Sequence, residues 1–364
     1  DGDWVVDDCD DCVDPDDYNG AQDCAGVCDG DSYEDDCGTC DADPANDCVD
    51  YTIALDGVDL ISFHALPEDT EVETIFNSIE EFAPGVLGEG ISANYYNNMW
   101  MGTLMSIELT DGYWVVIDND EADLDVVDGI PTDPGTEFNL HQYTNLISYP
   151  FVGSAPVEET IPDGAQGSID AIIGEGEAAM NTETGWVGGL EYLEGTKGYW
   201  FITSEEVSFT YNPPVEGVAR KASPIRSVPM EFAFKQSTQQ AFYFVENATI
   251  GGEPIEKEDL IIAYNGDVRV GSRYWNGETT DVPAMGVPTI GTDGSNAYAG
   301  YCSAGDKISF KVLDVSSGNL IDMVADGETI WNNNGFSIRH FGSTPTSHRP
   351  FLPQDVIWRF APLR

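Results

Sequence analysis

Carboxylates and thiols are concentrated in the first fifty residues, and both groups could do chemistry there. Seven of the eight cysteines lie in this segment, which we call the arm (1–50): Cys9, Cys12, Cys24, Cys28, Cys37, Cys40 and Cys48. Aspartate is abundant between them and apolar side chains are few, so a buried apolar core cannot hold the arm. Paired cysteines would close short loops. A hard cation would gather carboxylates that otherwise repel one another.

The arm repeats itself with an offset of 28 residues. Asp1-Gly2-Asp3 returns as Asp29-Gly30-Asp31, and Asp7-Asp8-Cys9 returns as Asp35-Asp36-Cys37. Calcium takes about six to eight oxygen ligands, which closely spaced acids beside a turn-forming glycine supply, although the spacing here is not that of an EF-hand. The predicted calcium ligands are Asp1, Asp3, Asp7, Asp8, Asp29, Asp31, Asp35, Asp36, Asp41, Asp43, Asn46 and Asp47.

Two alternatives to calcium stay open from the sequence. Cys9-x-x-Cys12 and Cys37-x-x-Cys40 have zinc-knuckle spacing, but the surrounding acids favour a harder ion. The other alternative is a solvated acidic linker with disulfides and no ion. All seven cysteines are disulfide candidates, and seven is odd. One of them is free, pairs with distant Cys302, or pairs with another chain.

The stretch from Asp23-Cys24-Ala25-Gly26-Val27-Cys28 through Cys48 resembles thrombospondin type 3 repeats and the related Asp/Cys repeats of large secreted proteins. The resemblance covers the arm alone. It implies an extended chain that wraps around calcium ions and is pinned by disulfides.

The charge balance is strongly acidic. Lys and Arg total 14 and Asp and Glu total 66, for a formal charge of −52, and the first basic residue is Lys197. Such a surface repels nucleic acid and anionic lipid and suits multivalent cations and a salty medium. Disulfide-type cysteine usage predicts a secreted, extracellular or cell-surface location. No apolar run is long enough to predict a membrane span. The chain begins at Asp1, so a signal peptide was removed or the sequence is an excerpt.

Residues 51–210 alternate apolar and polar runs with glycine turns, which predicts β structure. They contain a second repeat with an offset of 86 residues. Asp59–Phe63 returns as Asn145–Tyr149, and Gly112-Tyr113-Trp114 returns as Gly198-Tyr199-Trp200. The turn at 88–90 returns at 174–176, and Trp100 returns as Trp186. We therefore predict a duplicated domain, with copy 1 at 51–131 and copy 2 at 136–211.

Each copy is expected to be a small β or α+β domain. Copy 1 contains an apolar helical face: Val72, Ile75, Phe76, Ile79 and Phe82. Thr70 and Glu73 predict a capping box before it, whereas Pro162 and Gly164 shorten or remove the helix in copy 2. The repeated pattern resembles a small domain of secreted bacterial proteins, which implies location more than activity. The repeated tryptophans could stack on sugars, but a core role is favoured.

A linker is predicted at 212–230 and a third domain at 231–341. Short strands are predicted at 241–246, 260–264, 268–275 and 307–313, separated by turns such as Asn265-Gly266. The order of Ile261–Gly266, Trp275 and Gly305–Phe310 resembles a β-sandwich module of secreted, surface-delivered bacterial proteins. The resemblance implies an adhesin module or a binding region appended to an enzyme.

The tail at 342–364 differs in charge from the rest of the chain. Arg349, Arg359 and Arg364 stand against one acid, Asp355. Val356, Trp358 and Phe360 then alternate with other side chains, which is strand periodicity. Because a free apolar tail would promote aggregation, we predict a docking strand that adds to a sheet edge of this chain or of a neighbour.

We predict that the protein is not an enzyme. The familiar catalytic motifs are absent, and neither His64 nor His141 recurs at the equivalent position of the other copy. Glu89 and Glu175 could form the carboxylate pair of a glycosidase. They occupy equivalent turns of different copies, however, so a turn role is preferred.

The sequence thus predicts a mainly β protein with an extended Asp/Cys-rich arm, two tandem small β (α+β) repeat domains and one β-sandwich domain. The expected function is that of an extracellular structural or adhesive surface protein, with the subunit of an appendage or filament as its sharpest form. Calcium and disulfides would stiffen it, and it would self-associate into a homopolymer or surface assembly. The alternative is the carbohydrate-binding accessory region of a larger secreted enzyme, with a glycan as partner.

Overall fold

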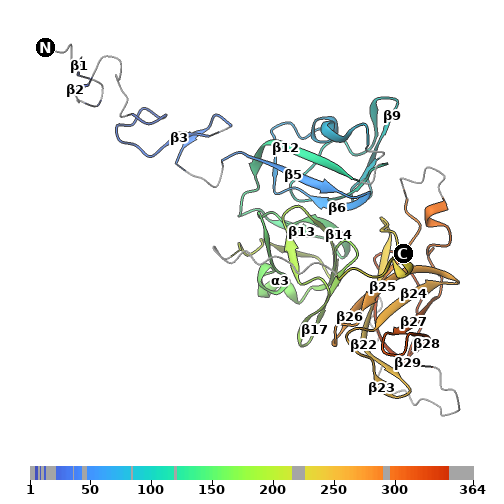
Figure 1. Cartoon of the computed structure of the whole chain (residues 1–364). Coiled ribbons are helices and arrows are strands. Elements are labelled where there is room, and N and C mark those ends of the chain that lie inside the picture. Colours follow the sequence, from blue (N-terminus) through green and yellow to red (C-terminus); the bar gives the residue numbers. More distant parts are fainter. Residues whose placement is uncertain are drawn as a thin grey trace.

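Figure 1 shows the protein as a computed structural model of the whole chain. The structure describes residues 5–6, 9, 12–13, 22–35, 37–42, 47–82, 85–118, 121–214, 226–289 and 296–343. Strands dominate these residues, which confirms the predicted mainly β fold. Several predicted site residues lie outside the described ones: Asp1, Asp3, Asp7, Asp8, Asp36, Asp43, Asn46, Val356, Trp358 and Phe360.

The arm extends away from the rest of the chain (Figure 1). It contains two short antiparallel pairs, β1 (Val5–Val6) with β2 (Cys12–Val13) and β3 (Tyr33–Glu34) with β4 (Cys40–Asp41). So little strand pairing cannot hold a chain segment in one conformation by itself. Other bonds must therefore stabilise the arm.

Copy 1 is built on a five-stranded antiparallel sheet in the order β10-β9-β8-β11-β6. Its strands are β6 (Val58–Ser62), β8 (Gly85–Leu87), β9 (Ser92–Tyr96), β10 (Met99–Gly102) and β11 (Gly112–Val116). A smaller sheet of β5 (Val49–Leu55), β12 (Ala122–Pro131) and β7 (Ala65–Leu66) completes it. Alternate side chains of β11 enter the copy 1 core, which includes Phe63, Phe76 and Tyr113.

Copy 2 has the same sheet order, β18-β17-β16-β20-β14. Its strands are β14 (Tyr143–Ser148), β16 (Ile169–Ile173), β17 (Ala178–Thr182), β18 (Gly185–Gly188) and β20 (Gly198–Thr203). The pairing register matches as well, since Trp114 lies opposite Leu60 and Trp200 lies opposite Leu146. Two small pairs flank this sheet, β13 (Phe138–Leu140) with β21 (Val207–Phe209) and β15 (Ser154–Pro156) with β19 (Tyr192–Glu194).

The predicted helix in copy 1 is shorter than its apolar pattern indicated. α1 (Val72–Ile75) ends after four residues and continues as the 3₁₀ helix η2 (Asn77–Ile79). The predicted capping box is wrong, because the carboxylate of Asp69 accepts bonds from the Glu71 N–H and the Thr74 hydroxyl instead. In copy 2 the helix is split at Pro162 into α2 (Val157–Thr160) and α3 (Asp163–Gln166), as the proline predicted.

The third domain is one eight-stranded sheet that curls on itself. The path β23-β22-β29-β28-β27-β24-β25 is completed by β26, which pairs with β22. The strands are β22 (Gln240–Ile250), β23 (Glu253–Pro254), β24 (Leu260–Asn265), β25 (Val268–Tyr274), β26 (Thr280–Met285), β27 (Ile308–Asp314), β28 (Asn319–Ala325) and β29 (Phe336–Ser343). At Gly271 an ideal Cβ would lie 1.7 Å from the Pro283 carbonyl, so β25 and β26 meet only because glycine stands there. Short 3₁₀ helices η3 (Met230–Phe232) and η4 (Asn296–Tyr298) lie beside the sheet.

The four repeated tryptophans belong to packed clusters. Trp100 packs against the copy 1 core and Trp186 against the copy 2 core. Trp114 and Trp200 belong to a cluster shared by the two copies, with Leu60 and Leu146. This packing agrees with the preferred core role rather than with sugar stacking.

Candidate functional site

Among the described residues three disulfides hold the arm: Cys9–Cys28, Cys24–Cys40 and Cys37–Cys48. The second and third disulfides each close a loop that begins inside the loop before it, so the three loops overlap along the arm. Cys9, Cys37 and Cys40 are therefore not zinc thiolates, and the zinc alternative is wrong. Cys302 is unpaired and buried in the third domain, so pairing of the odd cysteine with Cys302 is wrong as well.

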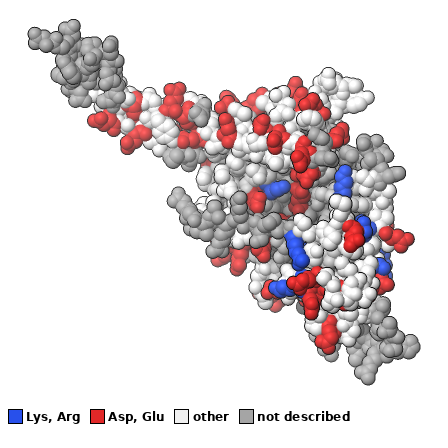
Figure 2. All heavy atoms as spheres, viewed as in Figure 1, with Lys and Arg blue, Asp and Glu red and all other residues white. Residues whose placement is uncertain are grey.

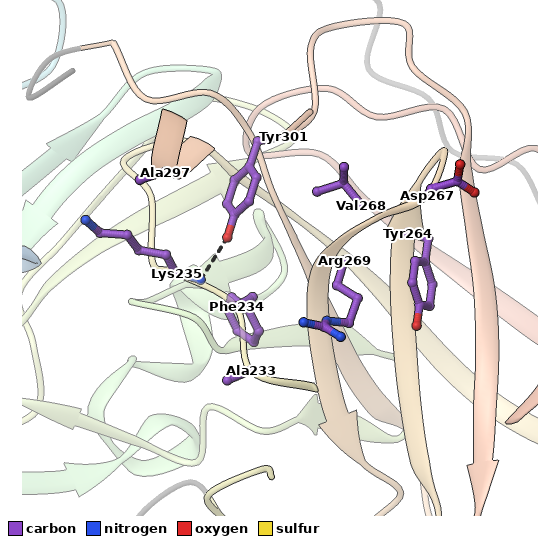
Figure 3. A pocket seen from close by; sticks show the side chains of 9 residues that line it. All are labelled: Ala233, Phe234, Lys235, Tyr264, Asp267, Val268, Arg269, Ala297 and Tyr301. Carbon is purple, nitrogen blue, oxygen red and sulfur yellow. Dashed lines mark hydrogen bonds between the residues drawn. The ribbon is translucent and has the colours of Figure 1, made fainter. Parts of the chain in front are cut away.

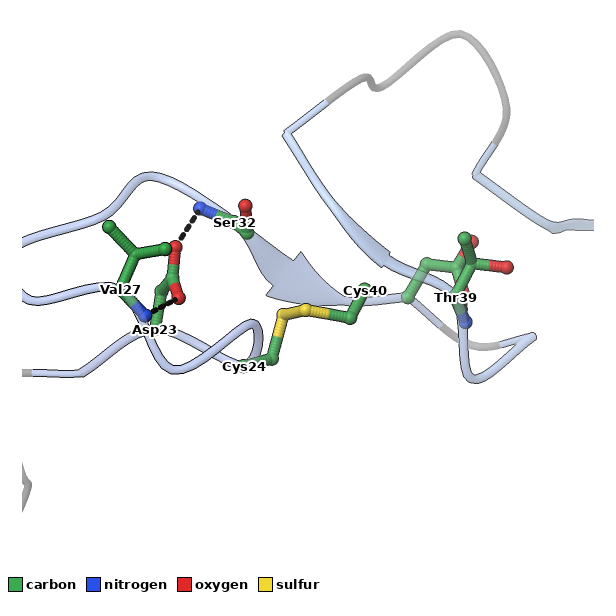
Figure 4. The surroundings of a disulfide bond; sticks show 7 residues. Asp23, Cys24, Val27, Ser32, Thr39 and Cys40 are labelled. Carbon is green, nitrogen blue, oxygen red and sulfur yellow. Dashed lines mark hydrogen bonds between the residues drawn. A yellow bond between two sulfur atoms is a disulfide. The ribbon is translucent and has the colours of Figure 1, made fainter.

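Two equivalent turns accompany the disulfides, and the sequence analysis missed them. The Asp23 carboxylate accepts the Val27 and Ser32 N–H groups at 2.8 and 3.2 Å (Figure 4), which lowers the pKa of Asp23. Twelve residues later, Asp35 accepts the Thr39 N–H at 2.7 Å. Gly26 and Gly38 adopt the same φ of 77° in these turns. An Asp-x-x-Gly-x-Cys pattern at 23–28 and 35–40 is the signal that would have revealed them.

Some of the predicted calcium ligands lie among the described residues. Of the twelve, Asp29, Asp31, Asp35, Asp41 and Asp47 are described. One Asp35 oxygen holds the turn, while Oδ2 is buried and has no hydrogen-bond partner among the described residues. The Tyr33 hydroxyl donates to Asp47, which raises the pKa of Tyr33 to about 12. Within the described ranges no three metal-ligating side chains gather, so calcium stays a proposal.

The arm is anchored to copy 1 where β5 begins. Cys48 is buried, and its Sγ contacts the Asp128 carbonyl at 3.4 Å. The Asp128 N–H donates to Asp50 at 2.9 Å. Because Cys37 is bonded to Cys48, the last loop of the arm is fastened directly to a strand of copy 1.

The two copies contact each other reciprocally through Glu89 and Glu175. Glu89 of copy 1 accepts the Leu146 N–H of copy 2 at 3.0 Å, and Glu175 of copy 2 accepts the Leu60 N–H of copy 1 at 3.1 Å. Each partner of one bond lies 86 residues from its counterpart in the other, so the contact has pseudo-twofold symmetry. Backbone bonds from Ser62 to Thr196 and from Ser148 to Thr110 repeat the same relation. Glu89 and Glu175 therefore join two domains and are not placed as a glycosidase pair.

Charge at this contact is distributed unequally. Glu89 pairs with His141 at 2.8 Å, whereas Glu175 pairs with Lys197 at 3.3 Å. Burial and the nearby Glu175 raise the pKa of Asp59 to about 7. Burial lowers the pKa of Lys197, but Glu175 and Asp59 outweigh it and the net shift is upward. The first cation of the chain thus lies where two acids meet between the copies.

The loop Gly174-Glu175-Gly176 also joins copy 2 to the third domain. Buried Gln240 accepts the Gly176 N–H at 3.0 Å and donates to the Gly174 carbonyl at 2.6 Å. Arg273 donates to the Gly176 carbonyl and pairs with buried Asp281 at 3.0 Å. One three-residue loop therefore contacts both copy 1 and the third domain.

A shallow, open hollow of about 800 Å³ lies on the third domain (Figure 3). In this view the Arg269 guanidinium lies between the rings of Phe234 and Tyr264, and the Asp267 carboxylate points away from it. Nε of Arg269 is buried and has no hydrogen-bond partner among the described residues. An aromatic wall with a cation at its centre can bind a planar or ring-shaped anion.

Two histidines among the described residues, His64 and His340, have structural surroundings. His64 is buried and stacks on Tyr51 at a centroid distance of 4.1 Å, and burial lowers its pKa. His340 of β29 pairs with Glu246 of β22 and with Asp326, which follows β28. None of these contacts brings a nucleophile, an acid and a base together in a cleft.

Comparisons with protein-family models, curated proteins and solved structures gave no match for this chain. None of the helices in the described ranges is long and apolar enough to cross a membrane. The disulfides of the arm are consistent with a secreted protein.

Proposed function

We propose that this chain is an extracellular structural or adhesive surface protein, built as the subunit of an appendage or filament and stiffened by calcium and disulfides. One observation carries the proposal. In the described part of the chain, each boundary between folded parts is bridged by specific bonds: Asp50 joins the arm to copy 1, Glu89 and Glu175 join the copies, and Gln240 with Arg273 joins copy 2 to the third domain.

Such bridging favours a mechanical role over a catalytic one. Inter-domain contacts within a chain are commonly mobile unless they are extensive and apolar. Here an apolar cluster accompanies the polar contact at two of the boundaries, with Leu60, Trp114 and Leu146 between the copies and Ile173, Phe242 and Phe244 behind the loop at 174–176. A chain of units fixed in this way resists bending, which a surface fibre requires.

Negative-stain microscopy of the purified full chain in calcium tests the proposal. Filaments, or rows of regularly repeated subunits, are the expected result. Monodisperse single particles at every concentration would contradict it. The same grids prepared with a calcium chelator show whether assembly depends on the ion.

Carbohydrate binding is the second candidate, and the hollow around Arg269 favours it. The rings of Phe234 and Tyr264 could stack on a pyranose while Arg269 binds a carboxylate, so an acidic sugar is the expected ligand. Calorimetric titration with uronic-acid oligosaccharides tests this function, with Arg269→Ala as the variant that should abolish binding. Lys257→Ala, a cation outside the hollow, is the matched control.

A further inference from the structure

The outward face of the copy 2 sheet is a docking face for the third domain. Ile173, Met180 and Val187 point from β16, β17 and β18 and pack against Phe242 and Phe244 of β22. At the rim of this contact, the buried Asp281 carboxylate accepts the Ala178 N–H at 2.9 Å. The outward face of this five-stranded sheet is thus covered by the third domain of the same chain.

The same face of copy 1 has no such cover among the described residues. The equivalents of Ile173, Glu177 and Val187 are Leu87, Ile91 and Met101, with Met99 and Tyr96 beside them. Tyr96 is 64% exposed, Met99 58%, Met101 52% and Ile91 39%. Leu87 packs against the cluster between the copies, so we call the exposed residues Ile91, Tyr96, Met99 and Met101 the open face. A contiguous exposed apolar group of this kind marks an interaction site.

The open face ends in an unpaired strand edge. β10 is the outermost strand of its sheet and pairs only with β9, through Met99–Tyr96 and Met101–Asn94, in the described part of the chain. An edge flanked by exposed apolar side chains accepts an added strand, which gains backbone hydrogen bonds and side-chain packing together. The geometry therefore favours an extended partner.

Charge restricts the chemistry of that partner. Of the 66 acids, 47 precede residue 197, whereas all 14 Lys and Arg residues lie from Lys197 onward. In Figure 2 the basic side chains gather over the third domain and the middle of the molecule, not over the arm. The open face lies in the half of the sequence that contains no lysine or arginine. A segment that fits the open face should be apolar, extended and basic.

We propose that the open face binds residues 350–364 of a second copy of this chain, added as a strand along β10. This segment has two arginines against one acid, and its Val356, Trp358 and Phe360 alternate as strand residues do. In the added strand one apolar row lies beside Met99 and Met101. The inference rests on the proposed function. It names residues 350–364 as the strand that one subunit donates and β10 as the edge of the next subunit that accepts it.

A second copy, rather than the same chain, is favoured by position. β29, the last described strand, lies at the opposite end of the molecule from the hairpin of β9 and β10 (Figure 1). Donor and acceptor are also different surfaces, so the contact is heterologous. A heterologous contact that does not close into a ring extends into an open filament.

Photo-crosslinking tests the contact directly. The full chain carries benzoylphenylalanine at Trp358 and is mixed with isotopically heavy chain before irradiation. Crosslinks between a light and a heavy chain that map to residues 91–101 are the expected result. Crosslinks that map elsewhere, or that join only residues of one chain, would overturn the proposal.

Matched surface variants separate this inference from the proposed function. Met101→Glu should weaken assembly by about tenfold or more in sedimentation velocity, because a carboxylate would be buried beside the added strand. Met230→Glu, at a methionine that is 91% exposed on the third domain, should assemble like the wild type. If the wild type forms filaments and Met101→Glu assembles equally well, the inference is overturned and the proposed function stands. A wild-type chain that never assembles would overturn both.

Discussion

Asp59 is the clearest case of a single residue adapted to the contact between the copies. Its carboxyl is buried, accepts the Asp56 N–H at 2.7 Å and lies near Glu175, and its pKa is raised to about 7. The equivalent residue of copy 2 is Asn145, whose amide bonds the backbone of His141. A neutral side chain therefore fits the corresponding turn, and the acid in copy 1 has a cost that depends on pH.

Asp59→Asn should remove that pH dependence. Because the folded pKa is raised, the native state binds more protons than the unfolded chain. The contribution to stability is complete below the unfolded pKa of about 3.9 and is lost as pH rises through about 7. The unfolding free energy of the variant, relative to wild type, should therefore increase from pH 4 to pH 7 and level off above. Urea unfolding at fixed calcium measures it.

Asp123→Asn provides the control for this prediction. Asp123 is an exposed residue of β12, so its replacement should shift stability equally at every pH in the series. Parallel pH profiles for Asp59→Asn and the wild type would show that Asp59 is ionised in the folded protein and that the assignment is wrong.

At the scale of elements, the sequence reveals the repeated strands but not the contacts between the two copies. Gly112-Tyr113-Trp114 and its copy revealed the duplication, because buried strands keep their side-chain pattern. The bond from Leu60 to Glu175 has no such signature, since every residue except proline carries a backbone N–H. The helical face predicted from Val72 to Phe82 forms an α-helix only to Ile75, because the chain continues as a 3₁₀ turn. The docking of the copies depends on distances that composition and spacing do not contain.

Gly198→Ala tests how closely the elements of the two copies approach. An ideal Cβ at Gly198 would lie 2.6 Å from the Ile61 carbonyl of β6 and 3.2 Å from the Cα of Gly112, so the backbones of the two copies must separate. Overpacking of this kind costs about 1–3 kcal/mol. The free energy of unfolding in urea should fall by that amount, and copies 1 and 2 should begin to unfold separately.

A glycine in open space serves as the reference. An ideal Cβ at Gly164 in α3 meets no atom within 4 Å, so Gly164→Ala should leave stability unchanged or raise it slightly. Equal losses for the two variants would mean that the close approach at Gly198 does not hold the copies together.

At the scale of the whole molecule, charge divides the chain into two unlike parts. The formal charge of residues 1–196 is −47 and that of residues 197–364 is −5. The third domain neutralises its own acids with pairs such as Lys311–Asp322 and Arg273–Asp281. The arm has no lysine or arginine for this purpose. Ions from solution must therefore reduce its repulsion, and calcium is the ion that we propose for its carboxylate-rich turns.

Removal of calcium should loosen the arm and leave the rest of the molecule unchanged. Addition of EDTA should raise amide hydrogen exchange across the described arm residues 22–35 and 37–42, because repulsion between carboxylates then opposes the turns at Asp23 and Asp35. The three overlapping disulfides limit how far the arm can expand, so the effect should appear as faster exchange rather than as unfolding. Strands β14 and β20 serve as the internal control, since an antiparallel backbone ladder without acidic side chains holds them together. Exchange in the arm that EDTA does not change would rule out a stabilising calcium ion.

Magnesium at equal concentration should restore protection poorly, because its small octahedral shell fits flexible carboxylate turns less well.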